Sequence, residues 1–146
     1  MKIGITSDHR GYDLKELIKK EFKRDNVELI DYGTDSEEPA DFPVYAKKLG
    51  EAILNNDVDY GIAICGTGIG MSIALNKMKG IYCAKVSTAS EARLAKSHNN
   101  ANAIAFSEEL DDELKIEIVN CFLNTPFSNV SKYVKRNDMI KDMENA

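Results

Sequence analysis

Short apolar runs alternate along the chain with segments in which apolar residues recur at every third or fourth position. The runs are typical of strands, and the periodic segments are typical of amphipathic helices. The third run is almost entirely apolar, which predicts a strand buried on both faces. The five expected strands cover residues 3–6, 27–31, 60–64, 81–86 and 103–106.

The helix-periodic segments lie between these runs and after the last one. Asp13 and Glu16 have the spacing of a capping box for the first helix, and Thr88 and Glu91 have it for the fourth. Gly80 is the expected C-cap residue of the third helix. The expected helices lie near residues 14–22, 45–53, 70–78, 88–98, 114–122 and 130–143.

Strands that alternate with helices predict right-handed βαβ crossovers and a parallel sheet. We therefore expect one α/β domain over residues 1–146, a three-layer Rossmann-like fold with a five-stranded parallel sheet and helices on both faces. Ligands of such sheets bind at the carboxyl ends of the strands, near the point where the strand order reverses. The last helix, near residues 130–143, has a weak apolar face, so we expect it to pack on a partner subunit.

The most informative segment is Cys-Gly-Thr-Gly-Ile-Gly-Met-Ser at residues 65–72. Gly66, Gly68 and Gly70 leave backbone N–H groups exposed just before a helix, which is an arrangement that binds anions. The spacing differs from the dinucleotide fingerprint, and the end of the next strand lacks the acid that would bind ribose. A P-loop is excluded because no Gly-Lys-Ser/Thr follows.

Cys65 stands at the strand end directly before these N–H groups. Nearby amides and a helix N-terminus favour a thiolate, which can act as a nucleophile or as a base. Acyl transfer would call for the Gly-x-Ser-x-Gly elbow, which is absent. The alternative is proton abstraction beside a carbonyl, with the amides holding the enediolate oxygen.

Asp8, His9 and His98 lie beside predicted loops, and the chain has only two histidines. On their own these residues also fit a capping Asp, a solvated His and a His favoured by a helix C-terminus. A His that protonates a sugar ring oxygen and a carboxylate that orders hydroxyls would suit carbohydrate chemistry. His98 and Asn99 follow the fourth helix, so they would have to fold back or come from a second subunit.

Composition narrows the choice of partners. The chain has 24 acidic and 19 basic residues and a net charge of -5, which argues against binding nucleic acid. It has no apolar run long enough to span a membrane, and its first residues turn polar too early for a secretory signal. The three cysteines have wide spacings, which argues against a disulfide framework or a structural zinc site and favours a reducing cytoplasm.

Positive charge gathers locally near the C-terminus. Lys132, Lys135 and Arg136 form a basic cluster there, and Lys141 lies beyond it. Such a cluster is ordinarily a solvated helix face. It becomes a candidate phosphate site if the last helix reaches the pocket.

Taken together, these motifs resemble those of the ribose-5-phosphate isomerase type B family, which is shared with galactose-6-phosphate isomerase. The resemblance covers nearly the whole chain. It implies a Rossmann-like fold, a dimer or dimer of dimers with active sites at the subunit interface, and no metal or other cofactor. The motifs that carry it are Ser-Asp-His-Arg-Gly-Tyr at 7–12, Asp-Tyr-Gly-Thr at 31–34, Asp-Phe-Pro at 41–43, Cys-Gly-Thr-Gly-Ile-Gly at 65–70, Ala-Leu-Asn-Lys at 74–77 and Ser-His-Asn-Asn-Ala-Asn at 97–102.

The resemblance also implies catalytic roles. Cys65 would be the base that moves a proton between C1 and C2 of the sugar, and Thr67 would assist proton transfer. The amides of residues 66–70 would hold the enediolate. His98 would open the furanose ring, while Asp8 would contact the ring oxygen and hydroxyls.

The other implied contacts bind the substrate. Asn99 would share the hydroxyl contacts, His9 would lie near the phosphate, and Ser72 would belong to the same binding loop. Lys132 and Arg136 match two arginines that bind phosphate in the family. Because the alignment there needs about one inserted residue, Lys135 is a rival to Arg136.

The chain departs from the family pattern where phosphate is bound. Val-Ser-Lys-Tyr at 130–133 replaces the usual Gly-Gly-Arg-His, and lysine lacks the two-pronged grip of arginine. Glu109 and Tyr82 also occupy positions that are often arginine in the family. An acid facing a phosphate would be unfavourable, so we expect either a displaced loop or a rearranged phosphate site.

The sequence thus predicts a cytoplasmic aldose–ketose isomerase without a cofactor, acting on ribose 5-phosphate and ribulose 5-phosphate through a cis-enediolate. Two alternatives stay open. One is an isomerase of a six-carbon sugar phosphate such as allose or galactose 6-phosphate. The other is a flavodoxin-like nucleotide-binding module that uses the glycine loop as a phosphate cradle without catalysis.

Overall fold

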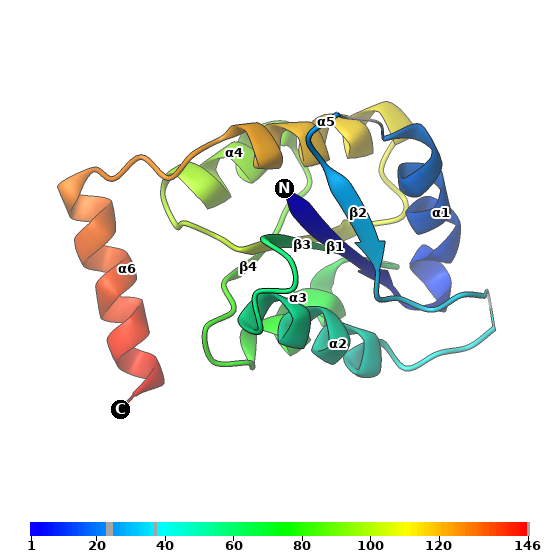
Figure 1. The fold of residues 1–146 in the computed structure, drawn as a ribbon, viewed down its shortest axis with the longest axis horizontal. Coiled ribbons are helices and arrows are strands. Elements are labelled where there is room, and N and C mark those ends of the chain that lie inside the picture. Colours follow the sequence, from blue (N-terminus) through cyan, green and yellow to red (C-terminus); the bar gives the residue numbers. More distant parts are fainter. Residues whose placement is uncertain (23–24, 37, 146) are drawn as a thin grey trace.

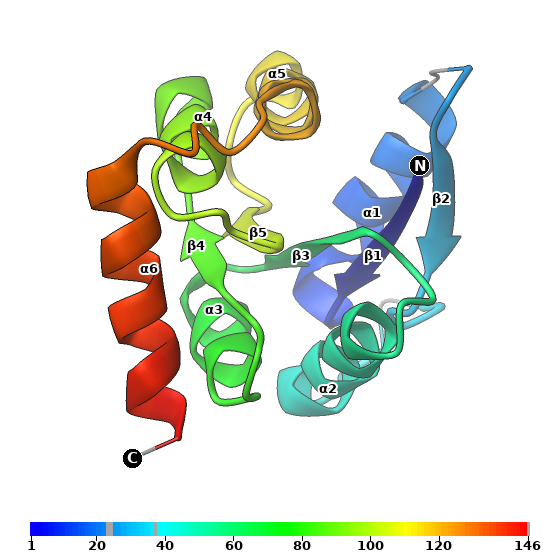
Figure 2. The ribbon, with the colours of Figure 1, turned by 60° about the vertical axis from the view of Figure 1, so that its left-hand side comes forward.

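The structure is a computed structural model that describes residues 1–22, 25–36 and 38–145. Its centre is a five-stranded parallel sheet with the order β2-β1-β3-β5-β4. This confirms the predicted sheet. Figure 1 shows the fold, and Figure 2 labels every strand of the sheet. The strands are β1 Lys2–Ser7, β2 Glu28–Asp31, β3 Tyr60–Cys65, β4 Cys83–Lys85 and β5 Ala103–Ser107.

Helices cover both faces of the sheet, as predicted. Helices α2 and α3 lie on one face, and α1, α4 and α5 lie on the other (Figures 1 and 2). No helix among the described residues is both long enough and apolar enough to cross a membrane. The helical elements are the 3₁₀ turn η1 His9–Gly11, α1 Tyr12–Glu21, α2 Phe42–Leu54, α3 Ile69–Asn76, α4 Ala89–Ser97, α5 Asp112–Asn124 and α6 Ser131–Glu144.

Side chains of each strand alternate between two apolar cores. On β3, Ile62 and Ile64 join the core beneath α1, α4 and α5, whereas Ala63 and Cys65 join the core beneath α2 and α3. This alternation follows from the two-residue period of a strand. It places the Cys65 side chain on the α2–α3 side of the sheet.

The first helix begins differently from the prediction. It starts at Tyr12 with Gly11 as its N-cap residue, and no side chain caps it, so the capping box of Asp13 and Glu16 is wrong. The reason lies one turn earlier. Asp8 Oδ1 accepts a hydrogen bond from the Gly11 amide over 3.1 Å, so the acid that satisfies this backbone is at the end of β1.

The third helix is shorter than predicted and ends at Asn76, so Gly80 is not its C-cap residue. The Asn76 side chain hydrogen-bonds both the amide and the carbonyl of Cys83, each over 2.8 Å, which ties the helix end to β4. Gly80 has φ +93° and turns the chain between them. The expected fourth strand shrinks to Cys83–Lys85, because the Tyr82 amide pairs with the Asn102 side chain over 2.9 Å instead.

The fourth and sixth helices follow the prediction closely. Thr88 caps α4 by accepting from the Glu91 amide over 3.1 Å, which confirms the capping box. Helix α6 covers residues 131–144, and none of its residues is buried. It stands at one side of the molecule, next to α4, β4 and α3 (Figure 2).

The strand order reverses between β1 and β3. From β1 the chain crosses to β2 on one side, and from β3 it crosses to β4 and β5 on the other. Loops that leave two adjacent strands in opposite directions open a crevice at the carboxyl ends of those strands. Asp8 follows β1 at this crevice, and Cys65 ends β3 there.

Candidate active site

Asp8 and Cys65 occupy neighbouring positions on adjacent strands. Ser7 pairs with Ile64 in the parallel register, so the next step along both strands brings Asp8 beside Cys65. Cys65 also pairs with Ser107 on its other side. Asp8 and Cys65 are 6% and 5% exposed, which shields both groups from bulk water. The predicted carboxylate and thiol are therefore brought together.

The glycine loop folds back on the Cys65 thiol. The Gly68 amide donates a hydrogen bond to Cys65 Sγ over 3.1 Å, in a buried position. Gly68 has φ +83°, and a Cβ there would lie 2.8 Å from the Cα of Phe106. Only glycine fits this conformation and this close approach. An N–H aimed at sulfur stabilises negative charge on it.

The rest of the loop is held by short local contacts. Thr67 Oγ1 accepts from the Ile69 amide over 3.1 Å and lies at the surface, where its own O–H can reach a substrate. Ser107 Oγ donates to the Gly66 carbonyl over 2.6 Å. A Cβ on Gly70 would lie 2.9 Å from the Phe42 ring, so glycine here lets α3 approach α2.

The side chains of Ser72 and His9 form hydrogen bonds within the protein, besides the substrate contacts expected of them. The Ser72 side chain hydrogen-bonds the Cys83 thiol, and its amide donates to the Gly68 carbonyl over 3.1 Å. His9 Nδ1 lies 3.1 Å from the Ala40 amide nitrogen and 3.2 Å from the Ala40 carbonyl oxygen. These contacts fix His9 beside Asp8 and leave the Ser72 hydroxyl directed at β4.

A second cluster gathers around His98. The His98 ring stacks on the Tyr133 ring of α6, with centroids 4.1 Å apart and planes 17° from parallel. The His98 carbonyl accepts from Asn137 Nδ2 over 2.9 Å. Lys132 Nζ lies 5.1 Å and Arg136 Cζ 6.0 Å from the centroid of the Tyr133 ring. The predicted histidine and cations are thus brought together by an aromatic residue that the sequence had not singled out.

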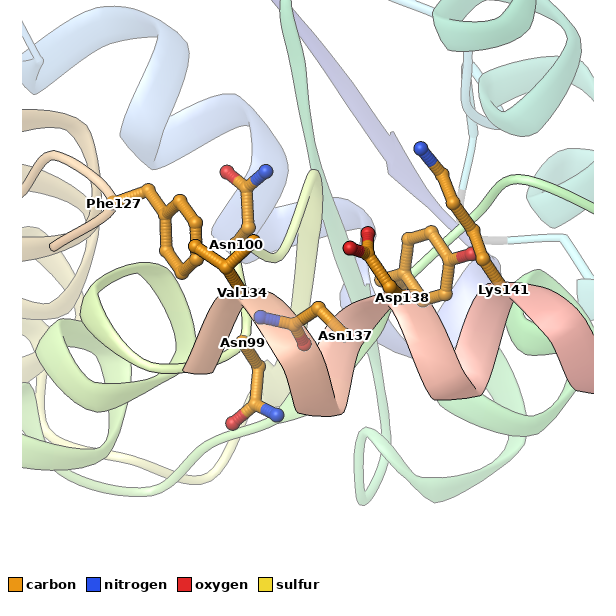
Figure 3. A pocket seen from close by; sticks show the side chains of 8 residues that line it. Asn99, Asn100, Phe127, Val134, Asn137, Asp138 and Lys141 are labelled. Atoms are coloured by element: carbon orange, nitrogen blue, oxygen red, sulfur yellow. The ribbon is translucent and has the colours of Figure 1, made fainter. Parts of the chain in front are cut away.

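Asn99 belongs to this second cluster. It lines a cavity of about 100 Å³ between the α4–β5 loop, the segment before α6 and α6 itself (Figure 3). Tyr82 lines the same cavity. Burial raises the pKa of the Tyr82 hydroxyl, and the Glu144 carboxylate at the end of α6 raises it further. Lys135 is absent from the lining of this cavity and instead lines an open groove along α6 with Asn129.

The two clusters lie at opposite ends of the sheet. Helix α4 leaves the carboxyl end of β4 and returns the chain to the start of β5, so His98 is at the amino end of the strands. Cys65 pairs with Ser107 at the carboxyl end of β5. A five-residue strand between them corresponds to about 15 Å. Within one chain the structure does not bring His98, Asn99, Lys132 or Arg136 to the thiol.

Glu109 and Tyr82, the two residues at positions that are often arginine in the family, lie in different clusters. Glu109 is exposed just after β5, and its amide donates to Ser107 Oγ over 3.0 Å, so this acid lies at the rim of the Cys65 cluster. Tyr82 lies with the His98 cluster. Among the described residues, no group of three or more His, Cys, Asp or Glu is arranged to hold a metal ion.

The sequence did not predict the contacts of Tyr133 and Asn137 with His98, or the contact of Ser107 with the glycine loop. Ser107 follows a predicted strand, so its position at the strand end was the available signal. Tyr133 and Asn137 are four residues apart on a polar helix, and nothing in that spacing indicates that they meet His98.

Comparison with known proteins places the chain among sugar-phosphate isomerases. Residues 3–140 match the family model described as Ribose/Galactose Isomerase. Ribose-5-phosphate isomerase B of Escherichia coli is 41% identical over 127 residues, covering 86% of this chain and 85% of that protein. The structure of Clostridium thermocellum ribose-5-phosphate isomerase B superposes with a TM-score of 0.95 at 40% identity, covering 99% of this chain and 98% of that one.

A third relative carries a ligand. The crystal structure of ribose-5-phosphate isomerase B from Mycoplasma genitalium with bound ribulose-5-phosphate has a TM-score of 0.90 at 35% identity, and the match covers 99% of this chain and 96% of that one. The agreement of the family model, the sequence relatives and the solved structures extends over nearly the whole length. The chain belongs to the ribose/galactose isomerase family.

Proposed function

We propose that this chain is an isomerase that interconverts ribose 5-phosphate and ribulose 5-phosphate, a reaction of the pentose phosphate pathway. Relatives at about 40% identity are ribose-5-phosphate isomerases B, and the Mycoplasma genitalium relative binds ribulose-5-phosphate. This reading is favoured over a six-carbon substrate and over a nucleotide-binding module without activity. The three free cysteines suit a reducing cytoplasm as its location.

The observation that carries the proposal is the buried hydrogen bond from the Gly68 amide to Cys65 Sγ. Isomerisation requires a base that removes the proton on C2 of the open aldose and returns it to C1. A thiolate at Cys65 can serve as this base, and the amides of the glycine loop can stabilise the negative oxygen of the enediolate. The exposed Thr67 hydroxyl assists the proton transfer between O1 and O2.

Ring opening comes before this step, because ribose 5-phosphate is mainly a furanose. His98 gives a proton to the ring oxygen O4 while the C1–O4 bond breaks, and the hydroxyl proton on O1 leaves to water as the carbonyl forms. Asp8 and Asn99 hold the ring oxygen and hydroxyls. Both histidine and thiol must therefore reach one substrate, although they lie at opposite ends of one chain.

Two copies of the chain resolve this separation. In a twofold dimer, the Cys65 cluster of one protomer faces the His98 cluster of its partner, and the same contact recurs once by symmetry. Helix α6 supports such an arrangement, because Val134, Met139, Ile140 and Met143 are exposed apolar side chains on a helix without a buried residue. We therefore propose a homodimer or a dimer of dimers with interfacial active sites.

Phosphate binding falls to Lys132, Arg136 and His9. Lys132 and Arg136 flank the Tyr133 ring on one helix, so they can meet the phosphate together. Lys132 supplies a point charge where an arginine would supply a fork. Lys135, which lies in the separate groove, is not part of this set.

The direct test is an aldose–ketose assay of the wild type and Cys65→Ala, each with and without a chelator. We expect wild-type turnover of ribose 5-phosphate that the chelator leaves unchanged, and a loss on the order of a hundredfold or more in Cys65→Ala. Equal turnover by both proteins would remove the role of Cys65. Faster turnover of allose or galactose 6-phosphate by the wild type would establish the six-carbon alternative.

Mixing two inactive variants tests the interfacial site. Cys65→Ala and His98→Ala each damage every site of their own homodimer. A hybrid dimer has one undamaged site, because that site takes Cys65 from one protomer and His98 from the other. Random exchange should thus restore about one quarter of wild-type activity. A mixture that stays inactive, although mass spectrometry shows the hybrid, would contradict the shared site.

A further inference from the structure

We propose that Tyr133 is a positioning residue that fixes the His98 ring for ring opening and joins it to the two cations on α6. This inference rests on the proposed function, in which His98 protonates the ring oxygen. Tyr133 stands where the Gly-Gly-Arg-His motif of the family has its histidine.

The first support is the geometry of the two rings. Their centroids are 4.1 Å apart and their planes 17° from parallel, which is a stacked arrangement. The Tyr133 ring therefore covers one face of the imidazole and limits its rotation. Within the described part of the chain, neither ring nitrogen of His98 has a hydrogen bond. Stacking thus sets the orientation of the ring and leaves its nitrogens for the substrate.

The second support is that the same helix also holds the His98 backbone. Asn137 Nδ2 donates to the His98 carbonyl over 2.9 Å. Tyr133 and Asn137 are four residues apart, so they lie on one face of α6. His98 follows the last residue of α4, where the backbone is least constrained by its own helix. Two contacts from α6 therefore replace that constraint, one to the backbone and one to the ring.

The third support is the position of the cations. Lys132 Nζ and Arg136 Cζ lie 5.1 and 6.0 Å from the centroid of the Tyr133 ring. An aromatic face attracts such cations, and an aliphatic side chain of similar size does not. Tyr133 thus stacks on the proposed proton donor and lies within cation–π range of both proposed phosphate ligands. The Tyr133 ring therefore holds the cations that would bind phosphate in a fixed position relative to the histidine that would donate the proton.

A role of Tyr133 in positioning His98 can be distinguished from a purely structural role by comparing two substrates. In ribose 5-phosphate, the proton from His98 goes to O4 as the C1–O4 bond breaks. 4-Deoxyribose 5-phosphate has no oxygen on C4, so it cannot form the furanose and presents its aldehyde directly. A defect confined to ring opening must lower kcat for the first substrate and spare kcat for the second.

The experiment compares the wild type with Tyr133→Leu and Tyr133→Phe on both substrates. For Tyr133→Leu we expect kcat with ribose 5-phosphate to fall by about tenfold to a hundredfold, since misalignment of a reacting group costs this much. Its kcat with 4-deoxyribose 5-phosphate should be unchanged, while KM rises for both substrates as the cations lose their ring. Tyr133→Phe should restore both parameters, because phenylalanine keeps the stack. Asp142→Asn, a change at an exposed position of the same helix, is the control for effects of substitution on α6.

A second measurement does not depend on turnover. The ring current of Tyr133 should shift the His98 imidazole proton signals upfield in the NMR spectrum, and His9→Gln assigns them because the chain has two histidines. The shift should vanish in Tyr133→Leu and persist in Tyr133→Phe. Equal loss of kcat on both substrates, no loss on either, or an unchanged His98 signal in Tyr133→Leu would overturn the inference. A wild type that does not isomerise ribose 5-phosphate would instead refute the proposed function.

Discussion

The Gly68 amide lies 3.1 Å from Cys65 Sγ and donates a hydrogen bond to it, at the point where β3 turns into α3. This hydrogen bond therefore closes the turn formed by residues 65–68. The contact depends on the left-handed conformation of Gly68 and on its approach to Phe106. The centre of the site thus depends on a backbone amide. Residue 68 must be glycine, because a side chain there would not fit.

Gly68→Ala should damage both stability and activity. A Cβ at φ +83° costs about 1–2 kcal/mol, and this one would also lie 2.8 Å from the Phe106 backbone, which cannot move aside cheaply. The displaced amide would no longer stabilise charge on Cys65, so we expect kcat to fall by roughly a hundredfold. Thermal unfolding and steady-state kinetics measure the two effects.

Gly80→Ala is the matched control for that change. Gly80 is also left-handed, with φ +93°, but its Cβ would meet the end of the Leu54 side chain at 2.9 Å. The backbone cost is similar, and no catalytic amide is displaced. We therefore expect a lower melting temperature with kcat retained. If Gly68→Ala kept its kcat as well, the role of the Gly68 amide would be refuted.

Cys83 should resist alkylation in the folded protein. Burial raises the pKa of its thiol to about 12, although the hydrogen bond from Ser72 acts in the opposite direction. At pH 8 its thiolate fraction is about 10⁻⁴, and the thiolate is the reactive form. Iodoacetamide should label the half-buried Cys121 and leave Cys83 unmodified, as read by peptide mass spectrometry. In urea, both should react; labelling of native Cys83 at the rate of Cys121 would contradict the prediction.

The sheet and the Cys65 cluster were predictable because they follow from local patterns and one topological rule. Apolar runs located all five strands, and the rule that ligands bind at the carboxyl ends of parallel strands selected Asp8 and Cys65. The register then places these two side by side. Neither step required knowledge of contacts between distant segments.

Errors arose where a side chain other than the expected one satisfied the backbone. Asp8 takes the Gly11 amide, which displaces the expected cap of α1, and Asn76 pairs with Cys83, which ends α3 early. The stack of Tyr133 on His98 depends on where α6 docks, and residues 130–143 carry no strong apolar periodicity that would show it. A tertiary contact such as this stack leaves no local signal.

Glu144 should anchor the end of α6. Its Oε1 accepts from the Gly80 amide over 3.1 Å, and its charge adds to the effect of burial in raising the pKa of Tyr82. Glu144→Ala should speed hydrogen exchange at Gly80 and lower the pKa of Tyr82 toward its ordinary value. Glu144→Gln, which keeps an accepting oxygen, should protect Gly80 better. Amide exchange by NMR is the test, and equal Gly80 rates in the wild type and Glu144→Ala would refute the anchor.

Lys96 should make the stability of the fold depend on pH in the alkaline range. Its side chain is 3% exposed, and Nζ donates to the carbonyls of Phe122 and Thr125, each over 3.2 Å. Nζ also lies 3.8 Å from the centroid of the Tyr60 ring. Burial lowers the pKa of Lys96 from 10.5 to about 8. The amine thus joins α4 to the end of α5 and holds its proton less tightly than an exposed lysine does.

The sign of the effect follows from proton binding. Between pH 8 and 10.5 the unfolded chain keeps the Lys96 proton and the folded chain has lost it, so the stability contributed by this group rises with pH. In Lys96→Met this rise is absent, and the two carbonyls lose their donor at a cost of about 1–3 kcal/mol. The stability of the wild type minus that of Lys96→Met should therefore increase by roughly 3 kcal/mol between pH 7 and pH 10.5. Urea unfolding of both proteins from pH 7 to 10.5 measures this difference, in which other titrating groups cancel. A difference that stayed constant or shrank with rising pH would show that Lys96 keeps an ordinary pKa in the folded protein.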